Sequence, residues 1–280
     1  MIIIADSSST RTEWALVDGS EIVAHAFTKG LNPFFQTRRE ISHTVRLELP
    51  EAFFRRRWDH VYFYGAGCAN KEKNKIMESS LVAQFKTLVT VESDLLGAAR
   101  GLLVREPGLA GILGTGSNSC LYDGHEIVRN VAPLGYVLGD EGSGAYMGKM
   151  LIADMLKGIA PADLTAAFFE KFVVTPNILM DDIYGNPMPN RTLSHYSTFL
   201  ADHLDNAYAY NLVYTSFMTY FERNIAAYDY KNRPLSLVGS TCVIYENILR
   251  RAAEDFGVTL HKLIRSSMPG LVEYHSTGNE

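Results

Sequence analysis

Apolar and polar positions in the first part of the chain alternate in short blocks, as expected for β-strands that are separated by tight turns. Apolar runs predict five strands, at residues 2–5, 13–17, 21–27, 61–64 and 88–91. The Asp18-Gly19 pair between the second and third strands is a strong hairpin signal. Residues 95–104 predict a helix that begins after Asp94.

The same pattern recurs further along the chain. It consists of a strand, a loop of Gly, Ser, Thr and Asn, a strand, an Asp-Gly turn and a strand, at residues 110–113, 114–119, 120–122, 123–124 and 126–131. An internal duplication of this kind predicts two related domains. Because Glu106-Pro107-Gly108 would break the preceding helix, we expect one domain at residues 1–106 and another at residues 107–280.

The rest of the second domain is predicted to be mainly helical. The expected helices span residues 142–156, 161–172, 194–204, 207–227 and 240–256, and a last helix begins near residue 269. One strand is expected at residues 235–238, directly before Gly239 and Ser240. This mixture of strands and helices indicates an α/β protein.

Composition and charge narrow the classes of function. With 47% apolar and 20% charged residues, the chain is expected to fold around a sizeable core. A formal net charge of -5 argues against nucleic acid or an acidic membrane as a partner, and the basic run at residues 55–57 is expected to mark a solvated helix end. No apolar run approaches the length of a membrane span, and the N-terminus does not have the pattern of a signal peptide.

The number and spacing of the cysteines indicate the redox environment of the protein. Cys68, Cys120 and Cys242 are far apart and odd in number, which favours a reducing compartment over a disulfide framework or an iron–sulfur cluster. We therefore expect a cytoplasmic protein.

Two loops rich in hydroxyl groups, residues 6–10 and 114–119, lie at equivalent places in the repeated pattern. Backbone N–H groups and hydroxyls in such loops can converge on an anion without a net positive charge. One such loop alone would be read as an ordinary hairpin turn, whereas two of them could hold one polyphosphate. Asp6 opens the first loop, either as an Asx-turn residue or as a carboxylate that orients hydrated Mg²⁺.

Three further acidic residues allow two interpretations each. Asp94 is either the N-cap of the following helix or a general base at the carboxyl end of a strand. Asp140 and Glu141 would interact favourably with the positive end of the dipole of the next helix. The glycines on either side suggest instead that a ligand approaches the backbone closely. The stretch that ends at Gly148 lacks residues of a Walker A loop, and the one at Gly114 does not continue as a dinucleotide fingerprint.

Three motifs, in this order, make the chain resemble a known family. They are Asp6-Ser-Ser-Ser-Thr-Arg-Thr, Gly114-Thr-Gly-Ser-Asn-Ser and Gly139-Asp-Glu-Gly-Ser-Gly-Ala. The resemblance is to the BadF/BadG/BcrA/BcrD ATPase family, and within it to the N-acetylglucosamine kinase branch of the sugar kinase, heat-shock protein and actin superfamily. It implies two ribonuclease-H-like (actin-like ATPase) domains, with ATP and a sugar bound in the cleft between them.

The resemblance also implies roles for individual residues. ATP would contact two loops and a later turn, through Asp6, Ser7, Ser8, Ser9, Thr10, Arg11, Thr12, Gly114, Thr115, Gly116, Ser117, Asn118, Gly239 and Ser240. The sugar would contact Asn32, Asp94, Gly139, Asp140 and Glu141. Asp94 would be the catalytic base, and Asp6 would bind Mg²⁺ through water. The chain departs from the family's usual pattern at the three loop serines, at Arg11 and at Leu134, where glycines, Lys and an aromatic residue are common.

The implied activity is that of an ATP-dependent sugar kinase. It would use Mg²⁺ to transfer the γ-phosphoryl group of ATP to a hydroxyl of an amino sugar, with N-acetylglucosamine as the expected acceptor. Two alternatives remain open at this point: an ATPase that activates a partner protein, and a sugar sensor without catalytic activity. The expected partner is a small-molecule sugar, with neither nucleic acid nor membrane, and the resemblance also allows a homodimer.

Overall fold

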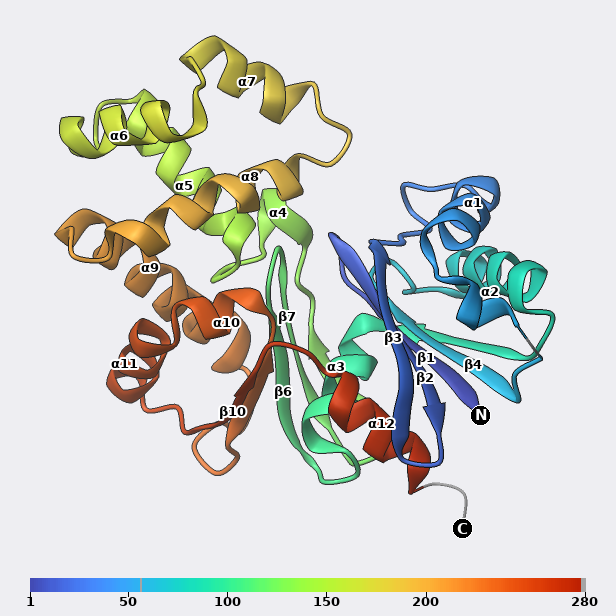
Figure 1. The fold of residues 1–280 in the computed structure, drawn as a ribbon. Helices are drawn as coiled ribbons and strands as arrows, with labels where there is room; N and C mark the ends of the chain where they lie inside the picture. The colour runs from blue at the N-terminus through green and yellow to red at the C-terminus, as the bar shows by residue number, and fades with distance from the viewer. Residues whose placement is uncertain (56, 278–280) are drawn as a thin grey trace. The chain divides into compact units, whose positions relative to one another are not determined.

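The computed structural model describes residues 1–55 and 57–277, so Arg56 of the basic run lies outside the described residues. Within the described part of the chain, the strands form two five-stranded mixed sheets (Figure 1). The chain divides into two compact units. Unit 1 consists of residues 1–110 and 120–129 and of the chain from Ser266 onward, and unit 2 consists of residues 111–119 and 130–265.

The first sheet has the strand order β3-β2-β1-β4-β5. Its strands are β1 (Ile2–Ser7), β2 (Arg11–Asp18), β3 (Glu21–Lys29), β4 (His60–Gly65) and β5 (Val89–Ser93). β2 is antiparallel to both β1 and β3, whereas β4 is parallel to β1 and β5 is parallel to β4. The register places Asp6 opposite Glu13 on β2 and opposite Tyr64 on β4. All five predicted strands are confirmed, with ends that differ from the prediction by two residues or fewer.

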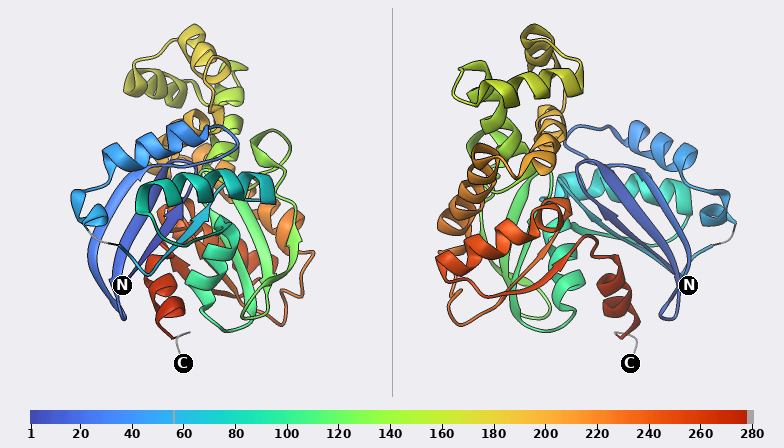
Figure 2. Two further views of the ribbon diagram at one scale, coloured as in Figure 1. Left: turned by 90° about the vertical axis from the view of Figure 1, so that its right-hand side faces the viewer. Right: turned by 60° about the vertical axis from the view of Figure 1, so that its left-hand side comes forward.

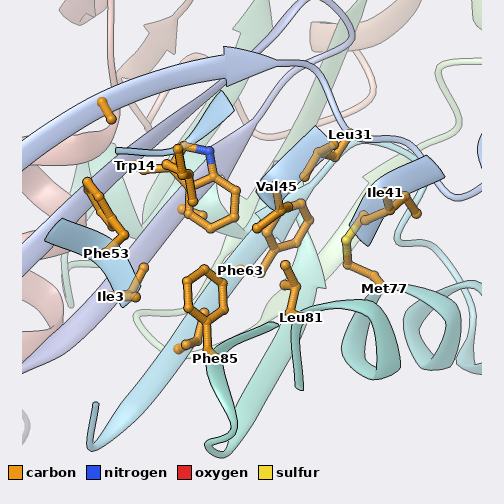
Figure 3. Close-up of a cluster of buried hydrophobic side chains, with 14 of the residues drawn as sticks. Ile3, Trp14, Leu31, Ile41, Val45, Phe53, Phe63, Met77, Leu81 and Phe85 are labelled. Atoms are coloured by element: carbon orange, nitrogen blue, oxygen red, sulfur yellow. The ribbon is translucent and has the colours of Figure 1, made fainter. Parts of the chain in front are cut away.

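Helices pack on both faces of this sheet because the apolar side chains of β1 alternate between the two faces. On one side, Ile3 belongs to a buried cluster with side chains of α1 (Arg38–Glu48), the 3₁₀-helix Glu51–Phe54 and α2 (Lys71–Phe85) (Figure 3). On the other side, Ile4 packs with α12 (Met268–Ser276), which lies against α3 (Asp94–Leu103). α12 thus begins close to the predicted helix start at residue 269.

The sequence analysis did not predict α1 or α2, although both have clear start signals. Thr37 and Glu40 form a capping box at the start of α1, and Asn70 caps α2 by accepting a hydrogen bond from the Lys73 amide. The helices bury Ile41 and Val45 from α1 and Met77, Leu81 and Phe85 from α2. Trp14 lies at the centre of this core, with its ring 6.2 Å from that of Phe63 and 6.0 Å from that of Phe85.

The second sheet repeats the topology of the first. Its strands are β6 (Gly108–Leu113), β7 (Ser117–Tyr122), β8 (Ile127–Val131), β9 (Leu235–Val238) and β10 (Leu260–Ile264). They are arranged in the order β10-β9-β6-β7-β8. Numbered from its own first strand, each sheet therefore has the order 3-2-1-4-5. This shared order confirms the predicted α/β fold built twice from one pattern; β10 was not predicted.

Helices make up the rest of unit 2. They are α4 (Gly135–Leu138), α5 (Gly144–Leu156), α6 (Ala162–Phe172), α7 (Pro176–Tyr184), α8 (Pro189–Ser197), the 3₁₀-helix Thr198–His203, α9 (Ala207–Tyr220), the π-helix Phe221–Ile225, α10 (Ser240–Ile244) and α11 (Glu246–Phe256). The predicted helix at residues 194–204 is wrong in its start and type, and the one at 207–227 is α-helical only to residue 220. α6 and α7 lie farthest from the second sheet (Figure 2).

An aromatic cluster joins α6 to α8 and to the 3₁₀-helix Thr198–His203. The ring of Phe168 in α6 lies 4.8 Å from Phe172, 5.5 Å from Tyr196 and 5.3 Å from Phe199. Aromatic pairs at such distances add to the free energy gained by burying the rings.

Within the described residues, no helix is both long and apolar enough to cross a membrane.

Candidate functional site

The first hydroxyl-rich loop is a tight turn between β1 and β2. The Ser8 amide donates to the Arg11 carbonyl at 3.0 Å, and the Ser8 hydroxyl accepts from the Thr10 and Arg11 amides at 3.3 and 3.4 Å. Ser8, Thr10 and Arg11 are exposed, and Ser9 is partly exposed. The tip of this loop therefore presents polar groups to solvent, as a phosphate-binding turn must.

The base of the same loop is buried and held by its own hydroxyls. The hydroxyls of Ser7 and Thr12 lie 2.7 Å apart, and Ser7 Oγ accepts from the Leu31 amide at 3.0 Å. The side chains of Ser7 and Thr12 thus fix the loop to the chain after β3. A Cβ at Gly30 would lie 2.6 Å from the Ser8 carbonyl oxygen, so only glycine allows this close approach.

Asp6 lies at the carboxyl end of β1 and accepts a hydrogen bond from Ser267 Oγ. Burial raises the pKa of Asp6 to about 7, with the Ser267 hydrogen bond opposing this and the charges of Asp94 and Glu13 adding to it. A half-buried carboxyl group beside two others is suited to a divalent cation, because the cation would offset their negative charge.

The residues fit one particular mode of magnesium binding. No group of three His, Cys, Asp or Glu side chains in the described part of the chain is arranged to enclose a metal ion. Mg²⁺, however, usually keeps several of its waters and is held by one or two carboxylates together with substrate phosphates. The Asp6 carboxyl, which lies near those of Glu13 and Asp94, is compatible with that mode, and binding of Mg²⁺ by Asp6 through water stays a prediction.

Asp94 is the first residue of α3, directly after β5. The N-cap is Ser93, whose hydroxyl accepts from the Leu96 amide at 3.2 Å, so the interpretation of Asp94 as the N-cap is wrong. Burial raises the pKa of Asp94 to about 6, although its hydrogen bond with the Leu95 amide acts in the opposite direction. A carboxyl group with this pKa is mainly ionised at pH 7 and close to the optimum for a general base.

Asn32, the predicted sugar ligand of unit 1, is buried in the turn after β3. Its Oδ1 atom accepts from the Phe34 backbone amide at 2.9 Å, and the backbone amide of Asn32 donates to Gln36 Oε1 at 2.7 Å. Gly67, with a φ of 80°, lies so close that an added Cβ would overlap Asn32 Oδ1. These contacts hold the Asn32 side chain in one orientation.

In unit 2, the second hydroxyl-rich loop joins β6 to β7. The Gly114 carbonyl accepts from the Gly144 amide at 2.9 Å and from the Thr241 hydroxyl at 2.9 Å, and the Thr115 carbonyl accepts from the Ala145 amide at 3.0 Å. The start of α5 and α10 therefore hold this loop from two directions.

The turn before α10 also lies against the second loop. Gly239 has a φ of 135°, and a Cβ there would overlap the Leu113 carbonyl oxygen. Any other residue would push the turn away from β6. Gly239 and Ser240, the predicted adenosine neighbours, thus lie beside the second hydroxyl-rich loop within one unit.

The two adjacent acids after Gly139 have different surroundings. Asp140 adopts a φ of 56°, and its Oδ1 accepts from the Ser117 amide at 3.1 Å, so it packs on the second loop. Glu141 is buried and bonds to Arg223 Nη1 at 2.9 Å and to Asn224 Nδ2 at 3.2 Å. Glu141 therefore joins the chain before α5 to the π-helix Phe221–Ile225, and this contact was not predicted.

Comparisons with known proteins complete these observations. No family model matches the chain, and no curated protein matches it. A crystal structure from Porphyromonas gingivalis, of a protein described as a candidate N-acetylglucosamine kinase, is 40% identical over 100% of both chains, with a TM-score of 0.95.

The chain belongs to this N-acetylglucosamine kinase-like family of sugar kinases. More distant structures share the fold of the family. A candidate N-acetylglucosamine kinase from Chromobacterium violaceum is 17% identical over 98% of both chains, with a TM-score of 0.68. A ROK family glucokinase from Streptomyces griseus, solved with glucose and AMPPNP, is 13% identical over 98% of this chain and 97% of its own, with a TM-score of 0.63. The fold is that of the actin-like ATPase sugar kinases.

Three residues of this kinase-like chain were missed as neighbours of the predicted site. Glu13 faces Asp6 across β1 and β2, Ser267 donates to Asp6, and Gly30 supports the first loop. The pairing of Asp6 with Glu13 was within reach of the sequence, because both lie near the same hairpin. Ser267 had no local signal, because it follows Asp6 by 261 residues.

Proposed function

We propose that this protein transfers the γ-phosphoryl group of ATP to a hydroxyl of N-acetylglucosamine or a closely related amino sugar, with Mg²⁺. One observation carries the proposal. Unit 1 contains Asp94, whose carboxyl group has a pKa of about 6 and lies near Asp6, and it also contains the hydroxyl-rich turn between β1 and β2. The full-length similarity to a candidate N-acetylglucosamine kinase supports the choice of sugar.

The proposed role of each residue in binding ATP follows from its contacts. The exposed tip of the first loop, residues 8–11, and the second loop, residues 114–118, would donate hydrogen bonds to phosphate oxygens. The buried Ser7 and Thr12 would act through the backbone, since their hydroxyls hold the loop together. Gly239 and Ser240 would border the adenosine.

Phosphoryl transfer depends mainly on positioning and on neutralising charge. Mg²⁺ supplies that neutralisation when bound, and Asp6 would hold it through water. Asp94 would accept the proton of the sugar hydroxyl as the sugar oxygen bonds to the γ-phosphorus and the bond from that phosphorus to the bridging oxygen of ATP breaks, which releases ADP.

The sugar would be oriented mainly by Asn32 and Asp140, next to Gly139. Glu141 would act indirectly, because its carboxylate is engaged by Arg223 and Asn224. We also propose membership of the BadF/BadG/BcrA/BcrD family, which rests on the three motifs, and a homodimer, which rests on that resemblance. A domain boundary between residues 106 and 107 is proposed from the helix-breaking stretch Glu106-Pro107-Gly108.

ATP consumption measured against a panel of sugars tests the function. We expect ATP use that depends on an added sugar and is fastest with N-acetylglucosamine, compared with glucose, glucosamine and N-acetylmannosamine. ATP hydrolysis at the same rate without sugar would instead indicate an ATPase that acts on a partner. Sugar binding without any use of ATP would indicate a sensor.

A further inference from the structure

We propose that Ser267 is a positioning residue of this enzyme, which holds the Asp6 carboxylate in the orientation that hydrated Mg²⁺ requires. The inference rests on the proposed kinase function. Ser267 is 1% exposed, and its Oγ atom donates to Oδ2 of Asp6. A hydrogen bond from a buried hydroxyl to a carboxylate restricts rotation of that carboxylate.

The residue before Ser267 makes a parallel contact. Ser266 Oγ donates to Glu13 Oε2 at 2.8 Å and accepts from the Met268 amide at 3.1 Å. Glu13 lies opposite Asp6 in the register of β1 and β2. Two successive hydroxyls of the C-terminal segment therefore bind two carboxylates that are neighbours across the sheet. Only one of them, Ser267, contacts the predicted magnesium-binding residue.

Two glycines allow the C-terminal segment to come this close. A Cβ on Gly101 of α3 would overlap the Ser267 side chain, and a Cβ on Gly270 of α12 would overlap the Gly101 carbonyl oxygen. The backbones of α3 and α12 are thus in direct contact. Because α3 begins at Asp94, the same pair of helices places both the proposed base and Ser267.

The other end of α12 is also fixed. His275 Nε2 lies 2.8 Å from the Tyr64 hydroxyl, and the His275 ring stacks on Tyr62 with centroids 3.8 Å apart. The Arg105 guanidinium lies over the Tyr274 ring at 4.3 Å. With both ends held, α12 cannot easily slide along the sheet, so Ser267 stays in place against Asp6.

The functional consequence follows from charge. Asp6 lies near Glu13 and Asp94, whose negative charges disfavour its ionised form. Without the Ser267 hydroxyl, the Asp6 carboxylate would lose a donor and could rotate away from the position in which it receives a magnesium-bound water. The affinity for Mg²⁺ and the rate that depends on it would then fall, whereas the affinity for the sugar would not change.

The variant Ser267→Ala tests this, and Ser266→Ala is the matched control in the same segment. For Ser267→Ala we expect about a tenfold lower kcat and about a tenfold higher Mg²⁺ concentration for half-maximal rate, as for loss of a hydrogen bond to a charged group. KM for the sugar should stay within about twofold. Ser266→Ala should stay within about twofold in all three quantities.

Calorimetry supplies a readout besides activity. ATP affinity would be measured with and without Mg²⁺ for wild type and both variants. We expect Ser267→Ala to lose most of the gain in affinity that Mg²⁺ provides, with ATP binding in its absence unchanged. An unchanged magnesium response in Ser267→Ala, or an equal loss in Ser266→Ala, would overturn the proposal.

Two further points keep the result decisive. If Ser267→Ala does not fold, Ser267→Cys takes its place, because a thiol has similar volume and is only a weak donor. If wild type shows no sugar-dependent use of ATP, the kinase function fails, but the effect of Mg²⁺ on ATP affinity still decides the role of Ser267.

Discussion

The Tyr64 hydroxyl and His275 Nε2 lie 2.8 Å apart and join β4 to the C-terminal helix α12. Arg100 Nη1 donates to the same hydroxyl at 3.0 Å. The Tyr64 oxygen accepts from Arg100, and the single phenol proton can be donated to His275 Nε2 when that nitrogen carries no proton. The neutral form of His275 therefore suits this attachment of α12 to the sheet.

This pairing predicts a loss of stability in mild acid. Burial, together with the nearby charges of Arg100, His60 and Arg105, lowers the pKa of His275 to about 4, whereas an unfolded chain would have a histidine pKa of about 6.5. Between these values the unfolded chain binds the extra proton, so stability falls as the pH falls from 6.5 to 4. We expect His275 to account for about 2 kcal/mol of the loss between pH 7 and pH 4.5.

The measurement is urea denaturation of wild type and His275→Gln at both pH values. Glutamine can accept from Tyr64 but does not titrate, so the variant should lose less stability on acidification. His43→Gln, at an exposed position on α1, is the control and should follow wild type. Equal losses in wild type and His275→Gln would contradict the prediction.

Asp94→Asn should abolish most turnover. The amide cannot accept the proton of the sugar hydroxyl, so kcat should fall by at least about 100-fold while sugar affinity stays similar. In wild type, kcat/KM should decrease below an apparent pKa near 6, because the carboxyl group that accepts the proton becomes protonated. Glu92→Gln, on the preceding strand, is the control. A rate near that of wild type in Asp94→Asn would rule out Asp94 as the base.

Asp6→Asn should make the protein more stable but inactive. Burial raises the pKa of Asp6 to about 7 from 3.8, so the folded form holds a proton that the unfolded chain releases. The free energy of unfolding of the wild type therefore falls as the pH rises from 3.8 through 7, because Asp6 loses its proton in the folded protein. Without nucleotide and Mg²⁺, the advantage of the variant should grow by about 2 kcal/mol between pH 5 and pH 8.

Denaturation curves of Asp6→Asn and wild type at these two pH values provide the check. Glu254→Gln, whose parent side chain is 75% exposed, should show no such growth. A stability difference that does not change with pH would mean that the Asp6 carboxyl is not held in an unfavourable environment.

Much of the fold was predictable because its signals are local. The strands around Asp18-Gly19 and their repeat around Asp123-Gly124 depend on apolar runs and turn residues that are close in sequence. The missed elements have weaker patterns: β10 has only five residues and their exposure does not alternate, and α1 and α2 bury a minority of their side chains. Their capping residues, Thr37 and Asn70, were the available signals.

By itself, the sequence determined the α/β class, the duplicated strand pattern, the two hydroxyl-rich loops and the acidic residues at strand ends. Only the tertiary structure decided that Glu141 binds Arg223 and that Ser267 binds Asp6. The reason is physical. Turns and strands follow from interactions between neighbouring residues, whereas the contact between Ser267 and Asp6 exists because Gly101 and Gly270 let two distant helices touch.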